Sequence, residues 1–280
     1  MATNSHTQGR FAITTRKLPI SKSAPIAAME ARLGIPVPEM IFGDNVVAVR
    51  HAPTGWRIEF NAYDALDAVD KTDKNMLQVA YAKSWSASRE QTSAGIKEVV
   101  KPYDWSYSTT YRGTTTPPSS TNTSDGENNE TPNLTPVGPA EDDPTRPAKQ
   151  IPLELLKRRD PILFFDDVVL YESELDDNGI SMLSVKTRVH EHRMLLLCRL
   201  FMRLDHVVAR VRDTRVYVDF DTDEVIREYT VKEGSYEDLK KAFRVSGLTP
   251  DGVTVALRDG NKVAEQLPII DQTIEHVSLK

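Results

Sequence analysis

The chain has 280 residues, of which 39% are hydrophobic and 27% are charged, and its formal net charge at pH 7 is -6. This acidic balance differs from the basic footprint of a general nucleic-acid-binding protein. No apolar run approaches the roughly 20 residues with which a helix crosses a bilayer. We therefore expect neither nucleic acid nor a membrane among the partners.

The N-terminus and the cysteine content indicate the compartment. Residues 1–6 lack the charged and apolar regions of a secretory signal. The single cysteine, Cys198, can form neither an internal disulfide nor a cysteine-ligated zinc site, which fits a reducing compartment. We expect a cytoplasmic and nuclear protein that is a monomer.

The N-terminal region predicts short elements of both kinds. Residues 1–10 are polar and are expected to be disordered, with a short edge strand over Arg10–Thr15. A helix is predicted from Ser23, and Gly34 suits the left-handed backbone with which many helices end.

A hairpin and a second helix follow. Apolar residues alternate with charged ones in Trp56–Phe60, which is the pattern of a half-buried strand, and we pair this strand with Val46–Arg50. Asn61 is a suitable N-cap for a short helix over Tyr63–Val69.

The composition changes in the middle of the chain. A helix is predicted over Leu77–Arg89, and Tyr103–Tyr107 alternates large aromatic with small polar residues, which favours a strand. Residues 113–150 then contain seven prolines, no aromatic residue and almost nothing to bury. We predict a disordered insertion at 113–150 within a single α+β domain over residues 11–280, whose early strands join the same core as the later ones.

The second half carries the densest apolar runs. Asn178-Gly179 predicts a hairpin between Ile162–Tyr171 and Ile180–Val189, because both central residues of such a turn need positive φ. Met194–Met202 is apolar nearly throughout and indicates a strand covered on both faces, although a buried helix fits the periodicity as well.

Further short elements surround this meander. Two β-rich runs, Val207–Val211 and Arg215–Phe220, flank Asp213-Thr214, which we interpret as a tight turn or a bulge. Short helices are predicted at Leu153–Arg159, Glu237–Phe243 and Ile269–His276. The fold class that follows is α+β, with an antiparallel sheet at its centre.

Two histidines form one candidate metal site. His190 and His192 lie two residues apart, on one face if the segment is a strand, but no third ligand follows at a recognisable spacing. A polar connector between two strands is the simpler interpretation. A metal-dependent enzyme that uses His190 and His192 is kept as an alternative.

A run of arginines is the one charge pattern that indicates binding. Arginine suits carboxylate and phosphate because its planar group donates two parallel hydrogen bonds. Ion pairs with Asp205, Asp213, Asp219 and Asp221 are the simpler interpretation, and a ligand clamp is the alternative. The arginines are Arg199, Arg203, Arg210, Arg212 and Arg215.

Five sequence blocks resemble the TIPRL proteins, the TOR signalling pathway regulator-like family. The resemblance runs from about Phe11 to about Glu228. The blocks are Pro38–Asn45, Phe60–Leu66, Lys101–Tyr107, Leu183–Val189 and Arg210–Tyr217.

The resemblance implies a fold and a function. The family fold has a central antiparallel sheet with helices on one side and a cleft on the other. Its members are non-enzymatic regulators, without a cofactor, that bind and inhibit the catalytic subunits of type-2A serine/threonine phosphatases in TOR signalling. The cleft is expected to hold the phosphatase C-terminal tail. An alternative is a scaffold that binds the alpha-four-type phosphatase adaptor and contacts the phosphatase only indirectly.

The resemblance also implies site residues. Family positions tied to phosphatase binding fall on Asp64, Ile151, Val211 and Asp213, and some relatives carry Met where this chain has Val211. We further hypothesise that one or two arginines meet the terminal carboxylate of the tail, or the acidic residue before it. The candidates are Arg203, Arg210, Arg212 and Arg215.

Overall fold

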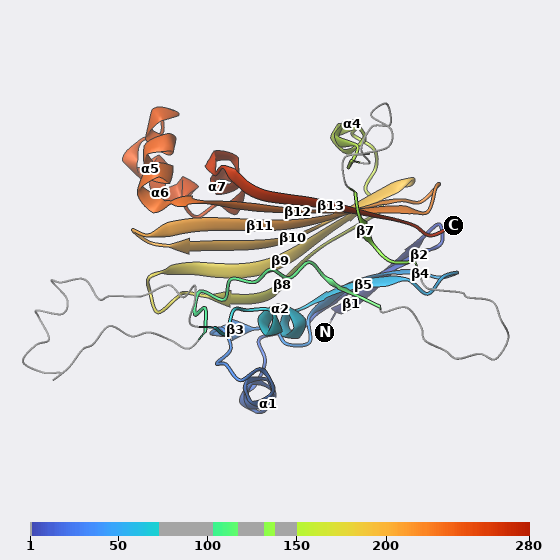
Figure 1. Cartoon of the computed structure of the whole chain (residues 1–280), viewed down its shortest axis with the longest axis horizontal. Coiled ribbons are helices and arrows are strands. Elements are labelled where there is room, and N and C mark those ends of the chain that lie inside the picture. The colour runs from blue at the N-terminus through green and yellow to red at the C-terminus, as the bar shows by residue number, and fades with distance from the viewer. Residues whose placement is uncertain (1, 73–102, 117–131, 138–149) are drawn as a thin grey trace, which may run out of the picture.

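Two antiparallel sheets packed face to face form the framework of the protein (Figure 1). The computed structural model describes residues 2–72, 103–116, 132–137 and 150–280. The helix predicted over Leu77–Arg89 lies outside the described residues.

The smaller sheet is built from the N-terminal part of the chain. Its order is β1-β2-β4-β5-β6. The strands are β1 (Ala2–Gln8), β2 (Phe11–Lys17), β4 (Val46–His51), β5 (Arg57–Asn61) and β6 (Thr114–Thr115). The β4–β5 hairpin confirms the pairing predicted from the sequence.

The expectation of a disordered N-terminus is wrong. β1 pairs with β2 along its whole length, so β2 is not an edge strand. Polar side chains such as those of β1 carry no alternating hydrophobic signal, and backbone pairing with β2 supplies the order instead. Gly9, with φ of 57°, takes the left-handed backbone in the turn between the two strands.

The larger sheet has the order β3-β8-β9-β10-β11-β12-β13-β7. Its strands are β3 (Met40–Ile41), β7 (Thr135–Pro136), β8 (Phe164–Ser173), β9 (Gly179–Val189), β10 (Arg193–Leu204), β11 (Val208–Asp219), β12 (Glu224–Ser235) and β13 (Ile269–Ser278). The predicted pairing of β8 with β9 is confirmed. The apolar run Met194–Met202 lies in β10, so it is a strand and not a helix.

Two predictions in this region are corrected. The runs Val207–Val211 and Arg215–Phe220 are joined by one continuous β11, which spans Val208–Asp219 and in which Asp213 is an ordinary strand residue opposite Arg199. Ile269–His276 is part of β13 and not a helix, because pairing with β12 decides its conformation.

The β8–β9 turn is longer than the predicted two-residue turn. Positive φ occurs at Leu175, Asp176 and Asp177 rather than at Asn178. Gly179 is needed for a different reason, because a Cβ there would collide with the carbonyl oxygen of Arg203.

Helices lie beyond both sheets (Figure 1). The helices are α1 (Ser23–Leu33), α2 (Ala62–Asp67), α4 (Leu153–Lys157), α5 (Tyr236–Val245), α6 (Pro250–Ala256) and α7 (Gly260–Gln266). As predicted, α1 ends at Gly34, with φ of 74°, and Asn61 caps α2. None of the described helices is long and apolar enough to cross a membrane. Strands and helices together confirm the α+β class.

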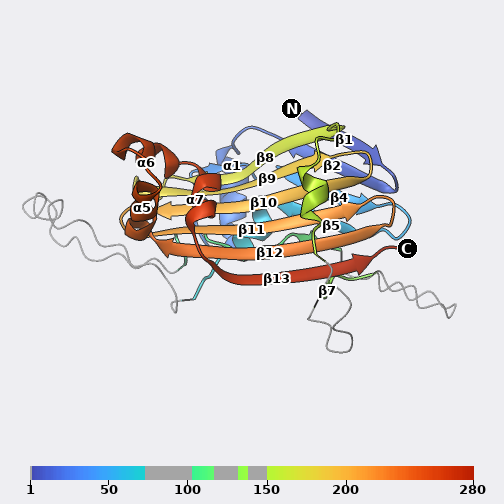
Figure 2. The same cartoon turned by 90° about the horizontal axis from the view of Figure 1, so that it is seen from above.

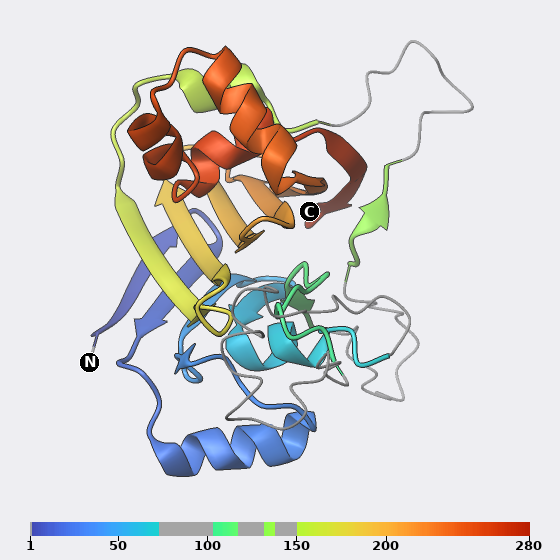
Figure 3. The ribbon, with the colours of Figure 1, turned by 90° about the vertical axis from the view of Figure 1, so that its left-hand side faces the viewer.

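The helices divide the outer face of the larger sheet. This face, which points away from the smaller sheet, carries α5, α6 and α7 toward one end of the strands and α4 toward the other (Figures 1 and 2). Seen from the end of the molecule, these helices and the smaller sheet lie on opposite sides of the larger sheet (Figure 3).

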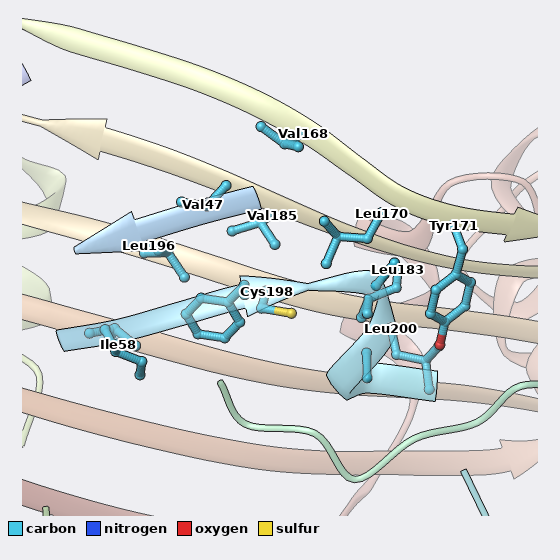
Figure 4. Close-up of a cluster of buried hydrophobic side chains, with 14 of the residues drawn as sticks. Val47, Ile58, Val168, Leu170, Tyr171, Leu183, Val185, Leu196, Cys198 and Leu200 are labelled. Carbon is cyan, nitrogen blue, oxygen red and sulfur yellow. The ribbon is translucent and has the colours of Figure 1, made fainter. Parts of the chain in front are cut away.

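One hydrophobic core lies between the sheets, as predicted for the early strands. Val47 and Ile58 of the smaller sheet share a cluster with Val185, Leu196 and Cys198 of the larger one (Figure 4). Burial raises the pKa of the Cys198 thiol well above its usual range, which keeps it protonated as a core residue.

The segments around the predicted insertion also differ from expectation. Tyr103–Tyr107 is not a strand but a turn whose aromatic rings are buried in the core. The hydroxyl of Tyr171 donates to the carbonyl oxygen of Tyr107 over 2.8 Å, which fixes the turn to the larger sheet. Within 113–150, the described parts include β6 and β7, which extend the two sheets, so these parts are not disordered.

Candidate functional site

The residues predicted to bind a partner fall on different faces of the larger sheet. Side chains alternate along a strand, so neighbours point to opposite faces. In β11, Val216 packs in the core between the sheets, whereas Val211 packs against α5, α6 and α7 on the outer face. Alternation therefore turns Asp213 outward and Arg212 inward, and the predicted set is not one site.

Asp213 holds an arginine on the outer face. The carboxylate accepts from Nε of Arg199 over 2.7 Å and from Nη2 over 2.6 Å. Both side chains are largely buried: 12% of the Asp213 side chain and 17% of the Arg199 side chain are exposed. Such a two-point charged contact is strong and directional, so Asp213 fixes the position of Arg199. Nη1 of Arg199 reaches Oδ1 of Asn261, in the first turn of α7, over 2.8 Å.

A groove lies beside this pair. We call it the outer groove; its volume is about 320 Å³, and it runs between α7 and strands β9 and β10. Arg199, Lys186 and Arg258 contribute positive charge to its lining. Its apolar side chains are Ile180, Met182, Leu197 and Phe201.

The three cations of the outer groove differ in their availability. Arg199 is engaged by Asp213, and Nζ of Lys186 lies 3.2 Å from a carboxylate oxygen of Asp167 at an exposed position. Arg258 is exposed, and its guanidinium makes no hydrogen bond or ion pair within the described parts of the chain. Arg258 is thus the cation most open to an incoming anion.

Three of the predicted arginines are engaged in internal ion pairs. Nε of Arg203 lies 2.6 Å from Oδ1 of Asp205. Arg210 and Arg215 pair with acidic residues of β12 over 2.5 Å each, and these partners are Glu233 and Glu228. The interpretation as ion pairs is therefore confirmed for them, although only Asp205 was foreseen as a partner.

Arg212 is the exception among the predicted arginines. It is half-buried on the inner face, and its Nε has no hydrogen-bond partner among the residues that the structure describes. The same holds for the neighbouring hydroxyl of Tyr229, on β12. Burial lowers the pKa of Arg212, and the nearby charge of Arg210 adds to this effect. Arg212 lies on the face of the sheet opposite to the outer groove.

The remaining predicted residues have structural contacts. Asp64, in α2, accepts from Asn61 over 2.9 Å and from the hydroxyl of Thr114. It therefore belongs to the smaller-sheet side of the molecule, away from Asp213 (Figure 1). Ile151 is buried in a small outer-face cluster with Tyr217 and Ile226. Val211 is fully buried beneath the helices, so it supports the outer face from below.

The histidine pair is a connector between β9 and β10, as the simpler interpretation had it. Nδ1 of His190 lies 2.8 Å from the carbonyl oxygen of Pro161, and Nδ1 of His192 lies 3.0 Å from Asp221. The two rings are thus held by different partners. Among the described residues, no group of three His, Cys, Asp or Glu side chains is placed to hold a metal ion.

Little in the sequence points to the outer groove. Arg199 is one of several arginines in the sequence, and Lys186 belongs to one of the family-like blocks. Nothing in the sequence singles out Arg258 and Asn261, because the pattern around α6 and α7 is short and polar. Their proximity to β10 is a tertiary feature that no local spacing encodes.

Comparisons with known proteins give a consistent result. Residues 40–240 match the TIP41-like family. The chain is 38% identical to the "Type 2A phosphatase activator TIP41" of Saccharomyces cerevisiae, over 95% of this chain and 72% of that protein. It is 38% identical to the human "TIP41-like protein", over 95% of this chain and 86% of that protein. The "Type 2A phosphatase activator tip41" of Schizosaccharomyces pombe is 30% identical, over 94% of each chain.

Proposed function

This chain belongs to the TIP41-like family, and on that premise we propose that it regulates type 2A protein phosphatases by binding their catalytic subunit. The observation that carries the proposal is the 38% identity to a type 2A phosphatase activator over 95% of the chain. Family membership agrees with the resemblance seen in the sequence blocks. The role proposed is that of a regulator and not of an enzyme.

We propose that binding restrains the phosphatase. Inhibition is what the TIPRL resemblance implies, whereas the two yeast relatives are named activators. Initial rates of dephosphorylation by the purified catalytic subunit, with and without this protein, give the direction of the effect. A fall in the rate of dephosphorylation that saturates at one molecule of this protein per catalytic subunit supports restraint, and a rise in the rate contradicts it.

The outer groove suits the C-terminal tail of the phosphatase. A tail with aromatic and aliphatic side chains and a free carboxylate would place its apolar groups on Leu197 and Phe201. Its carboxylate would meet Arg258, the groove cation that has no partner among the described residues. A hydrogen bond to a charged group contributes about 1.5–3 kcal/mol, which corresponds to roughly tenfold or more in affinity.

Asp213 has an indirect part in this proposal. Its side chain is directed at Arg199 and not at the groove. Removing the carboxylate would free Arg199 and change the charged wall of the groove. Asp213 is therefore a positioning residue, which accounts for a role in phosphatase binding without direct contact.

The test uses the phosphatase with and without its tail. We expect the catalytic subunit to be captured by this protein, and removal of its last few residues to weaken capture by about tenfold or more. Arg258→Ala should weaken capture of the complete subunit and leave capture of the shortened one unchanged. Arg50→Ala is the matched control, because Arg50 is an exposed arginine on β4 of the other sheet.

Pairwise mixing of purified components separates this proposal from the adaptor scaffold. Direct capture of the catalytic subunit in the absence of the alpha-four-type adaptor supports our proposal. Capture that requires the adaptor contradicts it and favours the scaffold. Metal analysis of the same preparation addresses the enzyme alternative, for which a stoichiometric transition metal bound at His190 and His192 is required.

A further inference from the structure

A second cavity, of about 460 Å³, lies beside the connector between β9 and β10. Three distant parts of the chain line it: Gln8 at the end of β1, the segment from Arg158 to Leu163, and the connector from His190 to Arg193. We call it the connector pocket. It shares no lining residue with the outer groove and plays no part in the proposed capture of the phosphatase tail.

Arg193 is the buried cation beside the connector pocket. Only 5% of its side chain is exposed, and its Nη2 donates to Oδ2 of Asp160. Its Nε has no hydrogen-bond partner among the described residues, but it is shielded from solvent and cannot donate to a ligand in the pocket. Arg193 therefore engages Asp160 and leaves Arg158 as the exposed cation of the pocket.

His190 presents one defined ring atom. Its Nδ1 lies 2.8 Å from the carbonyl oxygen of Pro161, and a carbonyl can only accept, so Nδ1 carries a proton. Nε2 is the remaining polar atom of a ring that lines the pocket. In the neutral ring Nε2 accepts a hydrogen bond, and in the protonated ring it donates one.

The charge at this end of the pocket is positive. Arg158 and Arg193 share one carboxylate, that of Asp160, whose Oδ2 lies 3.5 Å from Nε of Arg158. The hydrogen bond from Arg193 lowers the pKa of Asp160, which keeps it ionised. Because both arginines share the carboxylate of Asp160, Arg158, which is 60% exposed at the pocket, keeps positive charge that Asp160 does not balance. Glu191 also lines the pocket, but 78% of its side chain is exposed to solvent.

We propose that the connector pocket binds a phosphoryl group carried on a small organic group, such as a phosphorylated side chain. Its anionic oxygens would accept from the exposed guanidinium of Arg158, beside Nε2 of His190. A phosphate monoester has a second pKa of about 6, so near that pH it offers both an O–H, which can donate to Nε2 of His190, and anionic oxygens, which can accept from Arg158.

The size of the pocket favours a carrier over the bare ion. Cavities of roughly 300–1,000 Å³ accommodate small organic ligands, and the connector pocket falls in this range. Leu163, which is 48% exposed, gives the carrier an apolar wall. A carboxylate fits less well, because at neutral pH it has no O–H to offer Nε2 of His190.

The test is calorimetric titration of the purified full chain with O-phosphoserine, inorganic phosphate and serine. We expect one saturable site for phosphoserine and weaker or equal binding of phosphate, which competes for it. In spectra of the histidine rings, Nε2 of His190 should shift on binding while Nδ1 stays bonded to Pro161. Binding of serine as tight as that of phosphoserine overturns the proposal, as does the lack of a saturable site.

Three variants locate the site. Arg158→Ala, at an exposed position, should weaken phosphoserine binding about tenfold or more. His190→Asn keeps a donor near the position of Nδ1 but removes Nε2, and should also weaken binding. Arg258→Ala, in the outer groove, is the matched control and should bind phosphoserine like the parent chain. Unchanged binding in both Arg158→Ala and His190→Asn contradicts the proposal.

Discussion

At the scale of single residues, the partners of charged side chains decide what each one can do. The sequence shows arginines and acidic residues close together, but the structure shows which pairs form. Arg199 is held by Asp213 across a strand pair, whereas Arg258 has no partner in the described residues. A free cation is available to a ligand, and a paired one shapes its surroundings.

The Asp213–Arg199 pair gives a prediction about stability. Asp213→Asn leaves the largely buried guanidinium of Arg199 without a charged partner, and this should lower the free energy of unfolding by about 1–3 kcal/mol. Urea unfolding should show this loss, and phosphatase capture should weaken because Arg199 moves. A double-mutant cycle with Arg199→Gln measures the coupling between the two residues. Additive losses in the cycle would contradict the positioning role.

Protonation of His51 gives a prediction about pH. The ring is fully buried, and burial lowers its pKa below 6.5 despite the nearby carboxylate of Asp223. The unfolded chain therefore takes up the proton first as the pH falls. This contribution to stability is complete above pH 6.5 and is lost as the pH falls through the lowered pKa.

Urea unfolding at a series of pH values between 7.5 and 5 measures this loss. His51→Phe removes the titrating group and keeps a ring beside Phe11, which the native imidazole contacts at a centroid distance of 4.8 Å. We expect the variant to lose less stability on acidification than the parent chain. An equal loss in both proteins would show that other groups account for the pH dependence.

At the scale of elements, single residues predict where helices begin and end, whereas pairing between strands decides which segments become strands. Helix ends were predictable where one residue determines them, as with Asn61 at the start of α2 and Gly34 at the end of α1. The strands β1 and β13 are not predictable in this way, because backbone pairing with a neighbouring strand is enough to order a strand. The sequence predicts a turn or a bulge at Asp213, but in the structure this residue lies in the middle of β11, where it pairs with Arg199 on the neighbouring strand.

Gly179 gives a prediction at this scale. Gly179→Ala would press a Cβ against the backbone carbonyl of Arg203, which cannot move without disturbing β10. We expect the free energy of unfolding, measured with urea, to fall by more than about 2 kcal/mol, because steric strain adds to the usual effect of a substitution. Gly55→Ala is the control, because Gly55 also has positive φ but nothing lies within 4 Å of an added Cβ. Equal losses would contradict the steric argument.

At the scale of the whole molecule, the larger sheet separates the core from the outer face, where we propose that the partner binds. Its inner face packs on the smaller sheet, and its outer face carries α5, α6 and α7 at one end and α4 at the other (Figures 1 and 2). The sequence predicted the meander, the shared core and an arginine-rich surface. It could not predict which arginines meet in space, because that depends on strand alternation and on helices that lack strong patterns.

We propose that the outer groove receives the C-terminal tail of the phosphatase. Amide hydrogen exchange of this protein, alone and with the complete or the shortened catalytic subunit, tests it most directly. The account predicts that the complete subunit protects Ile180–Lys186 and Arg258–Asn261, and that the shortened subunit loses this protection. Protection of these segments that is equal with both forms, or found only on the smaller sheet, would contradict the account.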